Sequence, residues 1–146
     1  MRFDINVDDR QLRASLKGLR SAPKDPRLWN EMGHTLRAET LRCFRDQQSP
    51  SGVAWKPLSQ RTINMRRKGP KKSRSIQILR DTGTLMNSIG FRAGNGWCEC
   101  GTNVEYARKH QFGIGVPARP FLGLSEVFLR RAMMLLSEGI KRSWGK

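Results

Sequence analysis

The fold is decided by the stretch Phe91-Arg-Ala-Gly-Asn-Gly-Trp-Cys-Glu-Cys100, in which turn residues separate two short alternating runs. Glycine and asparagine supply the backbone angles that a tight turn needs, and the flanking residues alternate with the period of two that is typical of a strand. The stretch therefore predicts a β-hairpin. Cys98 and Cys100 lie two residues apart on its second strand, so both side chains are expected on the same face.

Helices are predicted after the hairpin. A short helix is expected from about 103 to 111, and Gly113 is placed to end it. Ser125 then caps a C-terminal amphipathic helix over residues 125–146, in which apolar residues recur at helical spacing. These residues are Phe128, Ala132, Leu135, Leu136 and Ile140.

Helices are also predicted before the hairpin. Asp81 is placed to cap a short helix that carries Leu85 and Ile89 on its inner side. Further upstream, an amphipathic helix is expected to run from Pro26 toward Gln48, because proline suits a first helical turn and apolar residues gather near one face. The residues of that face are Trp29, Met32, Leu36, Cys43 and Phe44.

The remaining N-terminal pattern completes a small domain. Alternation at 3–7 predicts a strand, and leucines at helical spacing within 12–19 predict a short helix. Two prolines and a glycine in 48–58 predict an ordered loop that holds Trp55 against the body. Residues 1–146 are therefore expected to form one α+β domain, with a small antiparallel sheet packed against two or three helices and a long basic loop.

The chain is strongly basic. It has 28 Lys and Arg against 12 Asp and Glu, which gives a formal net charge of +16. Such a surface attracts polyanions, so nucleic acid and acidic protein surfaces are the expected partners. The densest stretch, 61–80, contains cations and no acid and is predicted to be an exposed loop that faces DNA or a partner. Its cations are Arg61, Arg66, Arg67, Lys68, Lys71, Lys72, Arg74 and Arg80.

Cysteine usage predicts a reducing compartment. The three cysteines are an odd number, and residues 1–9 lack the basic and apolar blocks of a signal peptide. No apolar stretch approaches the roughly 20 residues that cross a bilayer. We therefore expect a soluble protein that does not enter a membrane.

One tripeptide suggests catalysis. Asp81-Thr82-Gly83 resembles the tripeptide that carries the catalytic carboxylate of aspartic proteases, in which two aspartates share one proton. A chain of this length would have to dimerise to supply the second aspartate. Arg80 is adjacent, and a nearby positive charge favours full ionisation of the carboxyl instead of a shared proton. A helix cap is the better interpretation of Asp81.

Other chemical sites find less support. Cys98, Cys100 and His110 fall short of four metal ligands with recognisable spacing, and no sequence context marks Cys43 or Cys100 as a nucleophile. The pair Gly94 and Gly96 lacks the third glycine and the lysine of phosphate-binding loops. We therefore predict a protein that is not an enzyme and needs no cofactor or metal.

An ordered series of short motifs spans about 44–124. The motifs are Ser49-Pro-Ser-Gly-Val-Ala-Trp55-Lys-Pro57-Leu58, Ile78-Leu-Arg-Asp-Thr-Gly83-Thr-Leu85 with Ser88-Ile89, Gly101-Thr-Asn103, Tyr106-Ala107, His110-Gln-Phe-Gly113 and Pro117-Ala-Arg-Pro-Phe-Leu-Gly-Leu124. Together they resemble the phage virion morphogenesis family, the tail completion proteins of Mu-like and P2-like tailed phages.

The resemblance implies a structural protein of the virion neck, at the interface of head and tail, that passes through the host cytoplasm during assembly. It implies a tail-completion, tail-terminator or head-tail joining role without catalysis. It also implies a homo-oligomeric ring, commonly a hexamer, around the DNA channel. Other neck and tail proteins are the implied partners, and non-specific contact with DNA is possible in such a channel.

Two groups of residues are candidates within this frame. The first group would anchor the interface between subunits or pack in the core, and both roles stay open: Trp55, Pro117, Arg119, Pro120, Phe121 and Leu122. The second group would form a structural motif, in which His110 is expected to be hydrogen-bonded at the edge of a helix packed on the sheet: Asp81, Gly83, Tyr106, His110, Phe112 and Gly113.

Two other functions remain as alternatives. A soluble basic protein could use the same cations to contact nucleic acid phosphates, with an affinity that falls steeply as salt rises. A dimeric aspartic protease using Asp81 is the more remote alternative.

Overall fold

The computed structural model describes residues 24–68 and 75–144. The strand expected at 3–7, the helix expected at 12–19 and the cations Lys71, Lys72 and Arg74 lie outside this part of the chain. Within it, helices and a two-stranded antiparallel sheet occur together, so the α+β prediction is confirmed. No helix within the described residues is long and apolar enough to cross a bilayer. The elements are α2 (Pro26–Asp46), α3 (Gln60–Lys68), α4 (Thr84–Asn87), β1 (Gly90–Gly94), β2 (Trp97–Gly101), α5 (Ala107–Phe112) and α6 (Glu126–Trp144).

The predicted β-hairpin is confirmed. The register pairs Gly90 with Gly101 at the open end and Gly94 with Trp97 next to the turn. Only two residues connect the strands, and the second of them, Gly96, has a φ of 89°. This is the left-handed region that glycine adopts without strain, so the turn chemistry in the sequence sets the register.

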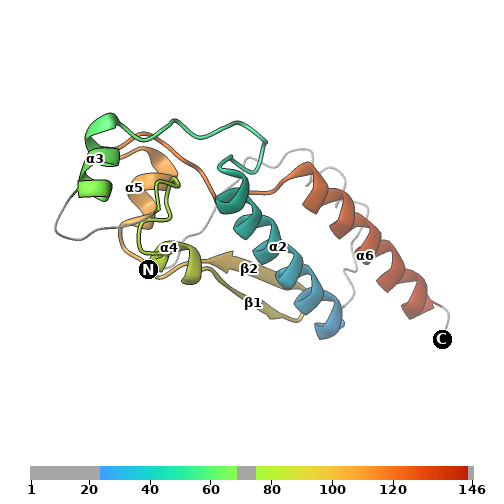
Figure 1. Ribbon diagram of the computed structural model, residues 1–146. Coiled ribbons are helices and arrows are strands. Elements are labelled where there is room, and N and C mark those ends of the chain that lie inside the picture. Colours follow the sequence, from blue (N-terminus) through green and yellow to red (C-terminus); the bar gives the residue numbers. More distant parts are fainter. Residues whose placement is uncertain (1–23, 69–74, 145–146) are drawn as a thin grey trace.

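One face of the hairpin packs against α2, as Figure 1 shows. The Sγ atom of Cys100 lies 3.8 Å from Oγ1 of Thr40 on α2, and Cys98 packs against the core between α2 and α6. The predicted common face of the two cysteines is therefore confirmed. Arg92 on β1 and Glu99 on β2 are partners in the hairpin register, and Nε of Arg92 lies 3.0 Å from Oε1 of Glu99 in an ion pair.

Helix α2 begins where the sequence predicts. The backbone N–H of Arg27 donates to Oδ1 of Asp25 at 2.9 Å, and Pro26 occupies the first turn. The helix ends at Gln47, which has a φ of 57°. In its middle, Gly33 is buried and the ring of Phe91 packs directly on its Cα, so a Cβ atom there would overlap the ring. Glycine at this position lets β1 approach the helix closely.

The core consists of two clusters joined by α2. The first cluster lies at the C-terminal half of α2, where the loop after α2 and the segment after α5 meet. The second lies between α2 and α6. The buried members of the first are Cys43, Phe44, Trp55, Leu85, Ile89, Ala107, Phe121 and Leu122. Those of the second are Leu28, Met32, Phe128, Ala132 and Leu136.

The capped C-terminal helix is also confirmed. The backbone N–H of Phe128 donates to Oγ of Ser125 at 3.0 Å, which is the geometry of an N-cap. The Ser125 hydroxyl in turn donates to Oε2 of Glu39 at 2.8 Å, and Arg42 pairs with the same carboxylate at 2.9 Å. The cap therefore also fixes the start of α6 against α2.

The predicted loop over 61–80 is wrong in its first part, because Gln60–Lys68 is a helix. The backbone N–H of Thr62 donates to Oγ of Ser59 at 3.2 Å, and that of Ile63 donates to the Ser59 carbonyl at 3.0 Å. Glutamine, arginine, methionine and lysine are good helix formers, so a cap is enough to start the helix. The weak apolar periodicity of the segment concealed it.

The predicted cap of α4 is also wrong. The N-cap is Gly83, with a φ of 81°, and the N–H of Thr84 donates to Oγ1 of Thr82 at 3.3 Å. A threonine hydroxyl therefore replaces the expected aspartate. The Asp81 carboxylate instead pairs with Arg66 of α3.

Replacing Gly33 with alanine tests the close packing of α2 on β1. Alanine should favour the helix by about 1 kcal/mol, but overlap with Phe91 should cost about 1–3 kcal/mol. We expect a net loss in the free energy of unfolding measured by denaturant titration. Ala38→Gly, at an exposed site of the same helix, reports helix propensity alone. A Gly33→Ala variant more stable than the wild type would contradict the described packing.

Candidate docking groove

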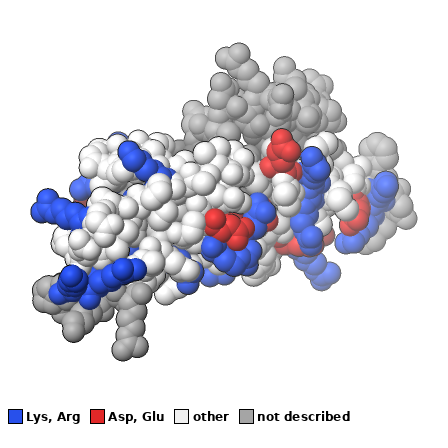
Figure 2. All heavy atoms as spheres, turned by 45° about the horizontal axis from the view of Figure 1, so that its top comes forward, with Lys and Arg blue, Asp and Glu red and all other residues white. Residues whose placement is uncertain are grey.

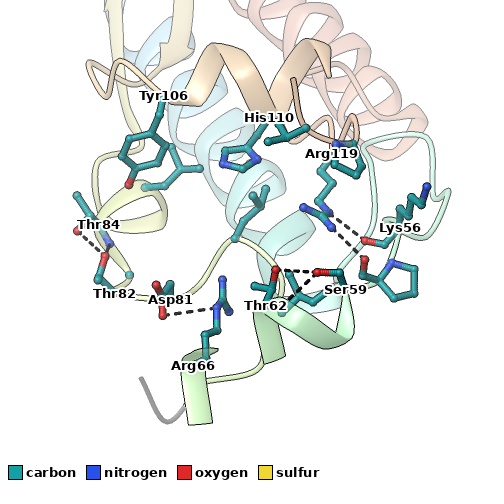
Figure 3. A pocket seen from close by; sticks show the side chains of 17 residues that line it. Lys56, Ser59, Thr62, Arg66, Asp81, Thr82, Thr84, Tyr106, His110 and Arg119 are labelled. Carbon is teal, nitrogen blue, oxygen red and sulfur yellow. Dashed lines mark hydrogen bonds and ion pairs between the residues drawn. The ribbon is translucent and has the colours of Figure 1, made fainter. Parts of the chain in front are cut away.

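A groove of about 950 Å³ opens where α3, α4 and α5 meet. Figure 3 shows side chains from these helices and from the segments beside them around its open middle. The lining residues come from four separate parts of the chain: Lys56, Pro57, Leu58, Ser59, Thr62 and Arg66; Leu79, Asp81, Thr82, Gly83, Thr84 and Leu85; Tyr106 and His110; Val116, Pro117 and Arg119.

The groove brings together residues from most of the motifs that carried the family resemblance. The segments 56–58, 81–85 and 117–119 each supply lining residues, as do Tyr106 and His110. These segments are far apart in the sequence and share no helix or strand. The order and spacing of the motifs therefore correspond to one surface feature.

Arg119 holds one wall of the groove in place. Its residue surface is only 6% exposed, its Nε donates to the carbonyl of Lys56 at 2.9 Å, and its Nη2 donates to that of Pro57 at 3.1 Å. Burial lowers the pKa of its guanidinium, and the charge of Arg66 lowers it further. Within one chain Arg119 therefore joins two groove segments, and its contact with another subunit stays a prediction.

Arg66 holds the opposite wall. Its side chain is 13% exposed, and its Nη1 donates to the carbonyls of Ser75 at 3.2 Å and Gln77 at 2.7 Å. Its Nε lies 3.6 Å from Oδ1 of Asp81. Arg66 therefore ties α3 to the segment before α4, and the prediction that its side chain is exposed on a loop is wrong. A guanidinium beside Asp81 also differs from the second carboxylate that an aspartic protease needs.

His110 and Tyr106 form the wall contributed by α5. Their ring centroids are 6.1 Å apart with the rings edge to face. Nδ1 of His110 is buried and has no hydrogen-bond partner among the described residues, so this atom does not make the hydrogen bond that was predicted for the side chain. Burial lowers the pKa of His110, and the charge of Arg119 lowers it further. The imidazole is therefore favoured in its neutral form.

Three of the apolar interface candidates, Trp55, Phe121 and Leu122, belong to the core of a single chain. Phe121 is 0% exposed, Trp55 and Leu122 are each 5% exposed, and Nε1 of Trp55 donates to the carbonyl of Pro120 at 2.8 Å. These contacts decide in favour of the core alternative and confirm the predicted anchoring of Trp55. Pro117 remains exposed and lines the groove.

Two glutamine side chains that the sequence analysis overlooked hold extended segments. Oε1 of Gln111 accepts from the backbone N–H groups of Phe121 at 3.0 Å and Leu122 at 3.1 Å, and its Nε2 donates to the carbonyl of Leu122 at 2.9 Å. Gln47 exchanges a similar pair of bonds with the backbone of Ile78. Each amide makes the backbone hydrogen bonds that a neighbouring strand would otherwise make. The place of Gln111 in the motif His110-Gln-Phe-Gly113, which carried the family resemblance, is the signal that could have found it.

The remaining motif residues end α5. Gly113 has a φ of 72°, and a Cβ atom there would lie 3.0 Å from that of Ala118, so the position needs glycine. The predicted end of this helix is confirmed. Phe112 is 60% exposed and contributes to neither core cluster.

The other cations of the predicted basic loop differ in exposure. Arg61, Arg67 and Lys68 are exposed on α3, whereas Arg80 is half-buried. Figure 2 shows Lys and Arg side chains spread along the whole visible face, with Asp and Glu in patches between them. Within the described residues, α3 therefore presents three exposed cations close to the groove.

The thiols show no sign of activation. Burial raises the pKa of Cys43 to about 11 and also raises those of Cys98 and Cys100. A thiol with a raised pKa stays protonated at neutral pH and is a poor nucleophile and metal ligand. No group of three potential metal ligands occurs among the residues that the structure describes.

A pre-formed groove on a basic domain is typical of a protein that binds other molecules. The model of the phage virion morphogenesis family matches residues 7–130, and the chain belongs to that family. The protein therefore has a structural or assembly role in a phage. The family match extends beyond the 44–124 region that carried the resemblance and includes the whole of α2.

Two curated relatives are similar over most of their length. Mu-like prophage FluMu G protein 1 of Haemophilus influenzae is 27% identical over 127 residues, which cover 86% of each chain. The putative capsid assembly protein G of Escherichia phage Mu is 30% identical over 138 residues, which cover 86% of this chain and 87% of the relative. No solved structure shows a significant match.

Replacing His110 with phenylalanine tests its buried nitrogen. The variant keeps an aromatic ring and removes an unsatisfied polar atom, so the free energy of unfolding at pH 7.5 should rise by about 1 kcal/mol. The wild type should also lose more stability than the variant between pH 7.5 and 5. The pKa of His110 is lowered in the fold, so below its ordinary value near 6.5 the unfolded chain binds the proton more readily. Equal pH dependence of the two proteins would contradict this.

Replacing Arg66 with alanine tests the groove wall. The change removes two hydrogen bonds and an ion pair of a largely buried side chain, so the free energy of unfolding should fall by about 2 kcal/mol. Arg67→Ala removes the same charge from an exposed neighbour and should change stability by less than about 0.5 kcal/mol. Similar losses in both variants, measured by denaturant titration, would show that Arg66 does not hold the wall.

Proposed function

We propose that this chain is a structural subunit of the phage head-tail neck, needed for tail completion or head-tail joining, and that it acts as part of a ring around the DNA channel. Membership of the virion morphogenesis family is the observation that carries this proposal. The name of the phage Mu relative, a putative capsid assembly protein, agrees with a role in building the particle.

The structure supports this function through its charge. The three exposed cations of α3 lie next to the groove, and the whole chain has a net charge of +16. Copies with this charge repel one another, so a ring of them needs anions nearby. DNA phosphates or an acidic neighbouring ring supply such anions, and α3 is the element we assign to that contact.

Reversing the exposed cations of α3 tests the assignment. The triple variant Arg61→Glu, Arg67→Glu, Lys68→Glu should lower the yield of infectious particles by roughly 100-fold or more in a complementation assay, because several phosphate or carboxylate contacts are lost together. Its thermal stability should stay close to that of the wild type, since all three side chains are exposed. Electron microscopy should then show unjoined heads or abnormal tails.

A matched control separates a local role from net charge. The triple variant Arg27→Glu, Arg131→Glu, Lys141→Glu makes the same charge change at exposed sites on α2 and α6, and it should assemble far better. Normal particle yields from the α3 variant would reject the proposed role of α3. A wild-type chain that stays monomeric with its virion partners and binds DNA tightly at low salt would favour the alternative of a soluble nucleic-acid-binding protein.

A further inference from the structure

We propose that the groove between α3, α4 and α5 binds an extended, carboxylate-bearing segment of another polypeptide. The identity of that polypeptide as a virion component rests on the proposed function, but the chemistry of the site does not. Three observations support the inference: the charge inside the groove, the way its cations are held, and the mixed character of its walls.

Charge is the first observation. The lining residues include the cations Lys56, Arg66 and Arg119, against a single carboxylate, Asp81. Figure 3 shows the guanidinium groups of Arg66 and Arg119 on different walls, both turned toward the groove. They are near enough for the charge of one to lower the pKa of the other. Two like charges held close together create a positive potential in the groove, and a bound carboxylate would be attracted to it and reduce the repulsion between them.

The fixed position of these cations is the second observation. Backbone carbonyls of Lys56 and Pro57 hold Arg119, and those of Ser75 and Gln77 hold Arg66. Neither guanidinium has to be ordered when a ligand arrives, so binding costs little side-chain entropy. On Arg119, Nη1 has no hydrogen-bond partner among the described residues and remains as a donor. A charge-assisted bond to a carboxylate is the strong interaction that such a donor offers.

The third observation is that the lining of the groove is mixed in character. It includes Leu58, Leu79 and Val116 together with three threonines, and Pro117 and Tyr106 are exposed, with Tyr106 43% exposed. A polypeptide presents apolar side chains, carboxylates and backbone bonds together, which suits such walls. A volume of about 950 Å³ admits a short segment of chain.

Duplex DNA is a poorer occupant of this groove. Its backbone carries one charge for about every 1.7 Å of axis and is best met by a row of cations on an open surface. The groove offers two fixed guanidinium groups in a lining that also contains leucine, valine and proline. The exposed cations of α3 are better placed for phosphates, so the two surfaces serve different anions.

The test uses fluorescence anisotropy with a labelled peptide in which glutamate and leucine alternate, and the same peptide with glutamine in place of glutamate. The purified chain should bind the acidic peptide and bind the glutamine peptide at least about tenfold more weakly. Thr84→Glu, which places a carboxylate on the groove wall, should weaken binding of the acidic peptide about fivefold or more. A carboxylate suits the first turn of α4, so this variant should fold.

Ser137→Glu is the matched control, because it makes the same charge change on the exposed surface of α6. It should weaken binding less than about twofold. Equal effects of the two substitutions, or equal binding of both peptides, would overturn the inference. Displacement of the peptide by a short DNA duplex that loses its own binding in Thr84→Glu would also overturn it and assign the groove to phosphate. Peptide binding needs no particle assembly. The groove proposal, tested by peptide binding, and the proposed function, tested by the yield of infectious particles, can therefore be rejected independently.

Discussion

The burial of Phe44 between Trp55 and Phe121 is the interaction on which the rest of the molecule depends. The ring of Phe44 is completely buried, with centroids 5.7 Å from Trp55 and 5.1 Å from Phe121. These three rings belong to the end of α2, the loop after it and the extended segment after α5. Aromatic side chains bury large areas, so their contact brings these segments together with a strong driving force. The same segments then continue into Lys56, Pro57 and Arg119, which form one wall of the groove.

Much of the fold could be predicted from local patterns. The hairpin, the capped helix α2, the glycine that ends α5 and the Ser125 cap of α6 each depend on residues a few positions apart, and all are confirmed. Helix α3 was missed because it is solvated on most sides and has little apolar periodicity. The Asp81 cap was wrong because Thr82 supplies a competing hydroxyl and Arg66 attracts the carboxylate. Local rules cannot weigh a partner that lies in a different helix.

The candidate site was harder to predict, since its geometry depends on contacts between distant segments. Arg66 and Arg119 look like surface cations in the sequence, yet each donates to backbone carbonyls of another segment. The sequence did indicate which residues belong together, because most motifs of the family resemblance contribute residues to the groove lining. It could not separate cations that backbone hydrogen bonds fix in place from cations that are freely exposed. That separation, between the largely buried Arg66 and the exposed Arg67, is the main functional information that the structure adds.

The two glutamine amides, Gln47 and Gln111, have a consequence for the conditions under which the groove keeps its shape. Both join backbone groups through neutral hydrogen bonds. Dissolved ions screen attractions between exposed charges but leave such bonds almost unchanged. Leu79, which lines the groove in a left-handed conformation with a φ of 58°, directly follows the residue that Gln47 holds. The segments that these amides hold are thus insensitive to ionic strength, while the Arg66–Asp81 ion pair and the attraction between the guanidinium groups and an anion are not. Salt therefore weakens the hold on an occupant more than it weakens the amide-held segments.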